Sequence, residues 1–179
     1  ITAANQMSAT HERQWIELQR LVNAGGKRLR PDMVFLAYQT FGGTDTAAIA
    51  PIAAAQELLH QSLLIHDDII DRDYVRHGVA NIQGSYRDYY AEYVHDVSDR
   101  DHFAGSAALL AGNLLLVGGY ELIAHSQIEP EIKQEVTMLF SQGIFAVSGG
   151  ELMDVESTFL PHGQTDTIGI ATYKTAYYS

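Results

Sequence analysis

The sequence predicts an all-α protein of one domain, residues 1–179, and three observations support this prediction. Only 4 of the 179 residues are proline and 46% are hydrophobic, which is enough for one domain with a buried core. Apolar residues recur with a long, helix-like period, and no stretch shows the two-residue alternation of a half-buried strand. Turn-forming residues such as Gly25, Gly26 and Pro161 divide the chain into segments of helical length.

Helices are expected over most of the chain. The expected segments are 8–23, Pro31 to the "FGGTD" turn, 46–71, 104–126, 130–157 and 165 to the end. Residues 79–102 are polar, charged and rich in tyrosine, so we expect a long loop insertion there, with a short helix near 88–94. Because the chain begins at Ile1 and ends in a helical segment, we expect it to be part of a longer protein.

Charge and composition exclude several classes of protein. The formal charge of -11, from 22 acidic and 11 basic residues, argues against a nucleic-acid partner. The absence of cysteine excludes disulfides and thiolate metal sites, and is consistent with a cytoplasmic location. No uninterrupted apolar stretch reaches the roughly 18 residues that would suggest a transmembrane segment. No basic-then-apolar segment at the N-terminus suggests secretion.

An acidic cluster ends the apolar 46–71 segment, in the sequence "LIHDDIIDRD" at positions 64–73. On a helix Asp67 and Asp71 lie one turn apart, and Asp68 is rotated by about 100° to one side. Two carboxylates about 6 Å apart repel each other by roughly 3 kcal/mol at an effective dielectric constant near 20. A solvated helix end offsets such repulsion, and so does a divalent cation. Acidic side chains at a helix C-terminus oppose the macrodipole, which favours the cation, and oxygen-only ligands suit Mg²⁺.

A basic cluster, "GGKRLRP" at positions 25–31, stands out in this acidic chain. Lys27 and Arg30 lie three residues apart at the expected start of a helix, next to glycines that allow close backbone approach. A lysine point charge beside an arginine fork suits a diphosphate. Taken alone, the cluster is better explained as a basic helix junction. Together with the acidic cluster, it indicates one diphosphate bound through Mg²⁺ and a second bound directly.

Five blocks in order resemble the signature blocks of the trans-isoprenyl (polyprenyl) diphosphate synthases, bacterial type. They are "GGKRLRP", "ELLHQSLLIHDDIIDRDYVRHG", "GSAALLAGNLLL", "GGELMDVE" and "YKTA". The resemblance implies an isoprenoid-synthase helical bundle, usually homodimeric, with a deep central cavity. It also implies a Mg²⁺-dependent prenyltransferase that condenses isopentenyl diphosphate with an allylic diphosphate. Only the N-terminal portion of such a protein is covered, so its C-terminal helices lie outside this sequence.

The resemblance assigns roles to individual residues. The metal-binding residues that it implies are Asp67, Asp68 and Asp71. Those implied for isopentenyl diphosphate are Lys27, Arg30, His60 and, in place of a usual arginine, His77. Those implied for the allylic diphosphate are Arg76, Lys174 and Thr175. The mechanism implied is ionisation of the allylic C–O bond, attack by the alkene of the second substrate, and loss of a proton.

The sequence departs from the family pattern at several positions. Asn113 replaces the usual aspartate of an "AGD" block, and we expect a buried hydrogen-bonding residue there. Glu151 replaces a frequent glutamine, with Asp154 one turn further on; we interpret Glu151 and the 79–102 insertion as a subfamily feature. The family's second aspartate-rich motif lies beyond Lys174, so these 179 residues alone are expected to be inactive.

Product length and two alternative functions complete the expectations. In this family the residues before the first aspartate motif form the upper floor of the product cavity, and here they are Ser62 and Leu63. With no aromatic ring at either position, we expect geranylgeranyl or longer products. A non-catalytic regulatory or scaffold subunit of the same fold remains an alternative. A terpene cyclase is a weaker one, because it handles a single diphosphate and leaves the basic cluster without a role.

Overall fold

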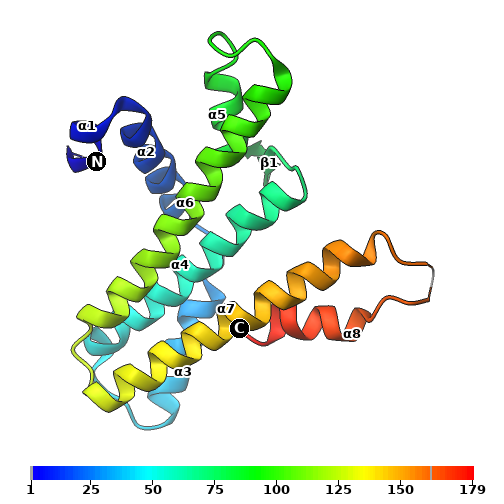
Figure 1. Ribbon diagram of the computed structural model, residues 1–179. Coiled ribbons are helices and arrows are strands. Elements are labelled where there is room, and N and C mark those ends of the chain that lie inside the picture. The colour runs from blue at the N-terminus through cyan, green and yellow to red at the C-terminus, as the bar shows by residue number, and fades with distance from the viewer. Residues whose placement is uncertain (1, 162) are drawn as a thin grey trace.

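The computed structural model describes residues 2–161 and 163–179, and it confirms the all-α prediction (Figure 1). The described elements are α1 (Thr2–Met7), α2 (Ala9–Asn23), α3 (Leu29–Thr40), α4 (Thr46–Ile70), β1 (Val75–Arg76), β2 (Val79–Ala80), α5 (Ile82–Tyr89), α6 (Val97–His125), α7 (Pro130–Ser157), α8 (Thr167–Ile170) and the π-helical segment η1 (Ala171–Ala176).

The long helices α4 and α6 lie side by side and form the centre of the molecule (Figure 1). Small side chains make this close packing possible: Ala104, Ala108 and Ala111 of α6 are at most 1% exposed. Leu59 of α4, also 1% exposed, packs with Phe140 of α7 in a second cluster at the other end of the pair. Helix α7 diverges from the pair, and η1 packs against it, so the site elements meet where α4, α7 and η1 approach one another (Figure 1).

The expected loop insertion is largely structured, and that prediction was wrong. A two-stranded hairpin turns through His77 and Gly78, whose φ angles of 54° and 80° both lie in the left-handed region, as a tight two-residue hairpin turn requires. Helix α5 follows, and its Tyr86 is 0% exposed and donates a hydrogen bond to the Thr10 carbonyl oxygen at 2.8 Å. Ile82 lies one turn earlier and is also buried, at 3% exposed. A short helix was expected near 88–94, but it lies earlier, at Ile82–Tyr89, where its apolar residues pack against α6.

Two helix starts differ from the expected positions. Helix α6 begins at Val97, because the Asp96 side chain accepts a hydrogen bond from the Asp99 amide at 2.9 Å and caps its N-terminus. Helix α3 begins at Leu29, so Pro31 lies in its first turn, where its missing N–H costs nothing.

Two helices of the described chain, α4 and α6, are long and apolar enough to cross a membrane by length and composition alone. The core helix of a bundle meets the same criterion, and these two helices pack against each other. The finding is therefore weak evidence for a membrane span.

Candidate active site

Two pockets meet at the middle of α4. One, of about 570 Å³, is lined by the basic cluster, and it brings together five of the predicted diphosphate-binding residues: Lys27, Arg30, His60, Arg76 and His77. The other, of about 710 Å³, brings together Leu63, Asp67, Lys174 and Thr175 from α4 and η1. Arg30 and His60 line both pockets, so the two cavities adjoin.

Arg30 is fixed by a small network at this junction. Its guanidinium lies 3.3 Å from Nε2 of His60 and donates to the hydroxyl of Tyr178 at 3.2 Å. His60 Nδ1 lies 3.2 Å from the same hydroxyl. Burial, followed by the nearby Arg30 charge, lowers the pKa of His60 below its ordinary value of 6.5. His60 is therefore a neutral partner near pH 7, and it adds no second positive charge that would repel Arg30.

The loop before α3 holds the basic side chains in an unusual backbone conformation. Arg28 adopts φ = 46°, and the preceding Gly25 and Gly26 have φ angles of 84° and 152°. A non-glycine residue in the left-handed region is costly and tends to occur at functional sites. Lys27 lies in this loop and its side chain is exposed at the pocket.

Arg76 binds the acidic motif in this structure. It donates to Asp68 Oδ1 at 2.6 Å and to Asp67 Oδ2 at 3.1 Å. Asp68 is 5% exposed, and burial raises its pKa although Arg76 lowers it. The hairpin that carries Arg76 packs its guanidinium against Oδ1 of this carboxylate, so Asp68 binds Arg76 in this structure and its role as a metal ligand stays a prediction.

Lys174 lies at the centre of three carboxylates from two other helices. Its Nζ is 2.6 Å from Asp154, 3.1 Å from Glu151 and 3.1 Å from Asp67. Burial lowers the pKa of Lys174, but these carboxylates outweigh it, and the net shift is upward. The ammonium therefore stays charged, and it connects the acidic motif of α4 to the "GGE" block of α7.

A glycine lets η1 approach closely enough for these contacts. A Cβ built at Gly150 would lie 2.2 Å from the backbone nitrogen of Lys174 and 2.6 Å from the carbonyl carbon of Tyr173. Only glycine fits there without movement of η1. The segment is also a π-helical turn, a rare geometry that is frequent at functional sites.

The carboxylates predicted to bind Mg²⁺ lie at the C-terminal end of α4. Within residues 2–161 and 163–179, no three or more His, Asp or Glu side chains are placed so that they could hold one metal ion together; the three carboxylates around Lys174 bind its ammonium. Asp67 and Asp71 remain on one helix face, and Asp71 is exposed at the end of α4. Burial and the neighbouring Asp67 raise the pKa of Asp71, which indicates a place where a cation is favourable. Two carboxylates fit Mg²⁺, which takes one or two of them and completes its shell with water and phosphate oxygens.

Other predicted residues are placed less favourably. Ser62 is 1% exposed and does not line the pocket, so only Leu63 of the two product-length residues faces the cavity. Asn113 is exposed on α6, contrary to the expectation of a buried residue. Sequence reasoning missed Tyr178, which orders Arg30 and His60, because a lone tyrosine near the chain end carries no motif signal.

Comparisons with known proteins identify the family of the chain. The family model described as "Polyprenyl synthetase" matches residues 15–179. A geranylfarnesyl diphosphate synthase of Aeropyrum pernix is 33% identical over 153 residues, which cover 83% of this chain and 43% of that protein. A geranylgeranyl diphosphate synthase of Methanosarcina mazei is 30% identical over 136 residues, which cover 76% of this chain and 36% of that protein.

Among solved structures, a geranylgeranyl pyrophosphate synthase from Corynebacterium glutamicum, complexed with isoprenyl diphosphate and magnesium, superposes with a TM-score of 0.84. It is 26% identical, and the match covers 99% of this chain and 51% of that one. The fold is therefore that of the isoprenoid synthases, and the chain belongs to the polyprenyl synthetase family. It spans less than half the length of the two curated relatives described above.

Proposed function

We propose that this chain is part of a Mg²⁺-dependent trans-prenyl diphosphate synthase, which condenses isopentenyl diphosphate with an allylic diphosphate. The observation that carries the proposal is the pair of adjoining pockets with opposite character. One is lined by Lys27, Arg30 and His77, and the other combines Asp67 and Lys174 with apolar residues. A reaction that joins two diphosphate esters needs both sites next to each other.

The basic pocket supports binding of isopentenyl diphosphate. Lys27 supplies a point charge and Arg30 a planar fork, which together match the oxygens of a diphosphate. His60 and Tyr178 hold Arg30 in place, so little side-chain freedom is lost when the ligand binds.

The second pocket supports the allylic substrate. Lys174 and Thr175 lie beside Asp67 at its mouth, and Leu63, Val147 and Leu152 form apolar walls. A charged ammonium at the mouth stabilises the departing diphosphate, and the apolar walls exclude water from the allylic cation. Asp67 and Asp71 are the residues that would hold Mg²⁺. When bound, the ion would supply further positive charge to the leaving group.

Product length, assembly and location follow as parts of the same proposal. Leu63 is the α4 side chain that faces the cavity one turn below Asp67, and its modest size is compatible with geranylgeranyl or longer products. Exposed apolar side chains on α6, such as Leu110 and Val117 at 57% and 55%, support a homodimer. The lack of cysteine is compatible with the cytoplasm.

Calorimetric titration of the full-length protein tests the assignment of the two pockets. Lys27→Ala and Arg30→Ala are each expected to raise the Kd for isopentenyl diphosphate by roughly tenfold or more, because one charge-assisted contact is worth about 1.5–3 kcal/mol. Asp71→Asn is expected to remove the Mg²⁺-dependent part of binding of an allylic diphosphate analogue. Lys133→Ala, on α7 away from both pockets, is the control for loss of charge. Equal allylic binding with and without Mg²⁺ would contradict the proposal.

A further inference from the structure

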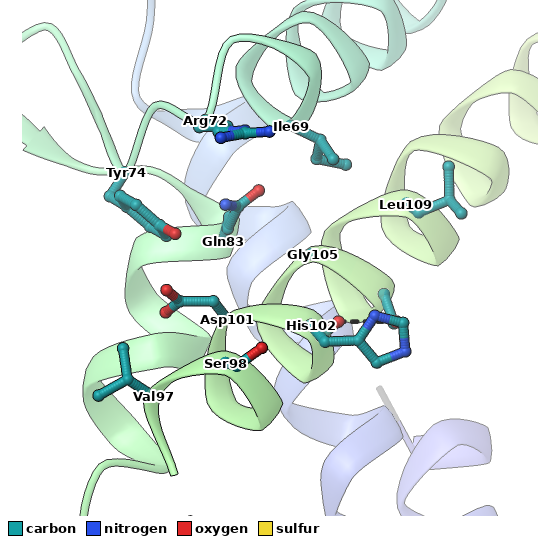
Figure 2. Close-up of a pocket in the computed structure, with 11 residues that line it drawn as sticks. Ile69, Arg72, Tyr74, Gln83, Val97, Ser98, Asp101, His102, Gly105 and Leu109 are labelled. Carbon is teal, nitrogen blue, oxygen red and sulfur yellow. Dashed lines mark hydrogen bonds between the residues drawn. The ribbon is translucent and has the colours of Figure 1, made fainter.

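A third cleft lies next to the C-terminal end of α4 and shares Ile69 and Leu109 with the second pocket (Figure 2). Its volume is about 800 Å³, and its lining comes from the end of α4, the start of the hairpin, α5 and the first turns of α6. The residues that matter to its chemistry are Arg72, Tyr74, Gln83, Asp101 and His102. None of them was assigned a role in prenyl transfer.

Gln83 is the first sign that the cleft binds a polar ligand. The side chain points into the middle of the cleft in Figure 2, and the residue is only 5% exposed. Its Oε1 atom has no hydrogen-bond partner among the described residues. A buried polar atom without a partner costs about 1–3 kcal/mol, so a group that hydrogen-bonds the amide here stabilises the protein.

Arg72 is the second sign. It follows α4 in the left-handed conformation with φ = 60°, as part of the C-terminal cap of the helix, in which the Asp73 amide donates to the Asp68 carbonyl oxygen at 2.8 Å. The arginines that form ion pairs within residues 2–161 and 163–179 are Arg13, Arg20, Arg76 and Arg87, and Arg72 is not one of them. Its guanidinium lies at the edge of the cleft above Gln83 (Figure 2).

The charge of the cleft favours an anion. Asp101 is the carboxylate in its described lining, and Arg87 pairs with it at 2.5 Å. This pair is neutral, and Arg72, which Asp71 and Asp73 flank along the chain, supplies the guanidinium of the described lining. Ser98 and Tyr74 add neutral hydroxyl groups to the lining.

The remaining surface of the cleft is apolar and connects it to both substrate pockets. Ile69 and Leu109 line this cleft and the pocket of Lys174, and Gln83 lines this cleft and the basic pocket. Gly105 leaves open space beside Gln83: a Cβ there would lie 3.9 Å from Oε1, in ordinary contact. An occupant would therefore press on side chains that also form the substrate sites.

We propose that this cleft is a second binding site, separate from both substrate pockets, for a small phosphate-bearing ligand. The ligand binds as its phosphate monoanion: the phosphate oxygens accept hydrogen bonds from Arg72, and the P–O–H that the monoanion retains donates to the Gln83 amide oxygen. An ionised carboxylate has no such donor and fits less well. Ile69 and Leu109 contact a short apolar group carried by the phosphate. Because the walls are shared, occupancy of this site changes the affinity for the prenyl substrates, and the effect is reciprocal.

The test is calorimetric titration of the full-length protein in Mg²⁺-free buffer, with orthophosphate and with isopentenyl monophosphate as probes. Arg72→Asn removes the guanidinium but keeps a residue that tolerates positive φ, and Gly105→Leu fills the cleft from α6. Arg100→Asn removes the same charge from the first turn of α6, outside the cleft, and is the matched control. Circular dichroism checks that each variant keeps its helix content.

We expect two classes of site for isopentenyl monophosphate in the wild type. Arg72→Asn and Gly105→Leu should each raise the Kd of one class, the cleft site, at least tenfold. Lys27→Ala should raise the Kd of the other class, the substrate site, and Arg100→Asn should change neither. If orthophosphate also binds in an Arg72-dependent way, the ligand is free phosphate; if only the monophosphate ester does, the apolar group is part of recognition. Binding that is unchanged in both cleft variants, or equally reduced by Arg100→Asn, overturns the proposal. If the Arg72-dependent class is found but no class depends on Lys27, the result counts against the proposed substrate site and leaves the cleft site supported.

Discussion

Gly149 and Gly150 are adjacent in α7, yet substitution by alanine should have opposite effects at the two positions. A Cβ at Gly149 meets nothing within 4 Å, whereas one at Gly150 would lie 2.2 Å from the backbone nitrogen of Lys174. Gly149→Ala should stabilise the protein by about 1 kcal/mol, because alanine is a better helix former than glycine. Gly150→Ala has the same gain in helix propensity, but the new methyl group overpacks the contact between α7 and η1, which should lower the free energy of unfolding by about 1–3 kcal/mol.

The difference between the two variants isolates the contact between α7 and η1, since the helix-propensity gain is common to both. Urea unfolding followed by circular dichroism measures it, and we expect Gly150→Ala to be less stable than Gly149→Ala by about 1–3 kcal/mol. The clashing atoms are backbone, so they cannot rotate away, and a value near the upper end is expected. Equal stabilities would show that η1 does not pack on Gly150, and the assigned position of Lys174 would then be wrong.

The same pair of variants tests the role of Lys174 in the full-length enzyme. Ordinary contacts begin near 3.4 Å, so η1 must retreat by about 1 Å to admit the new methyl group. A misplacement of about 1 Å in a catalytic group can reduce the rate about 100-fold. We expect a loss of that order in the kcat of Gly150→Ala and little change in Gly149→Ala. A Gly150→Ala enzyme that is displaced but fully active would refute the role of Lys174 at the leaving group.

Burial lowers the pKa values of His60 and His66 below 6.5 in the folded protein. As the pH falls, these histidines are therefore protonated in the unfolded chain before they are protonated in the folded protein. Their contribution to the free energy of unfolding is full above about pH 6.5 and decreases as the pH drops toward the folded-state pKa values. The thermal midpoint should therefore decrease below that pH, less steeply in His60→Gln, and an unchanged slope would contradict the assignment. Arg76→Ala leaves the buried Asp68 without its partner and should lower the free energy of unfolding in urea by about 3 kcal/mol. Adding Asp68→Asn removes the unpaired charge and should restore part of this loss; if it restores nothing, the two residues are not coupled. Leu63→Phe narrows the cavity one turn below the acidic motif, so the full-length variant should make shorter products, which chromatography measures. A wild-type enzyme that stops at farnesyl diphosphate would refute the product-length proposal.

The acidic motif shows how far helix geometry alone could go. A rotation of 100° per residue separates Asp68 from the face shared by Asp67 and Asp71, and the structure keeps that separation, since Asp68 is buried and Asp71 is exposed. The partner of Asp68 could not be predicted, because Arg76 reaches it from a hairpin whose turn depends on the left-handed backbone of His77 and Gly78.

The α5 segment shows where local pattern failed. Only Ile82 and Tyr86, four residues apart, follow the helical spacing of apolar residues, and they lie within a charged, tyrosine-rich stretch. A pattern this short does not distinguish a helix from a loop. Packing against α6 supplies the free energy that the segment lacks by itself, since isolated helices of this length are marginal.

By itself the sequence determined the all-α class, most of the helix bounds and the two charged clusters, because periodicity, turn residues and charge act over one or two turns of chain. Tertiary structure alone decided which charges meet. Lys174 lies 107 positions after Asp67 in the chain, and the two pair at 3.1 Å only because Gly150 lets η1 pack on α7. It also decided that Arg72 and Gln83 would line one cleft, where Arg72 forms no ion pair and Gln83 Oε1 no hydrogen bond with the part of the chain that the structure describes. Contacts between distant segments depend on how helices pack, and no local pattern encodes that.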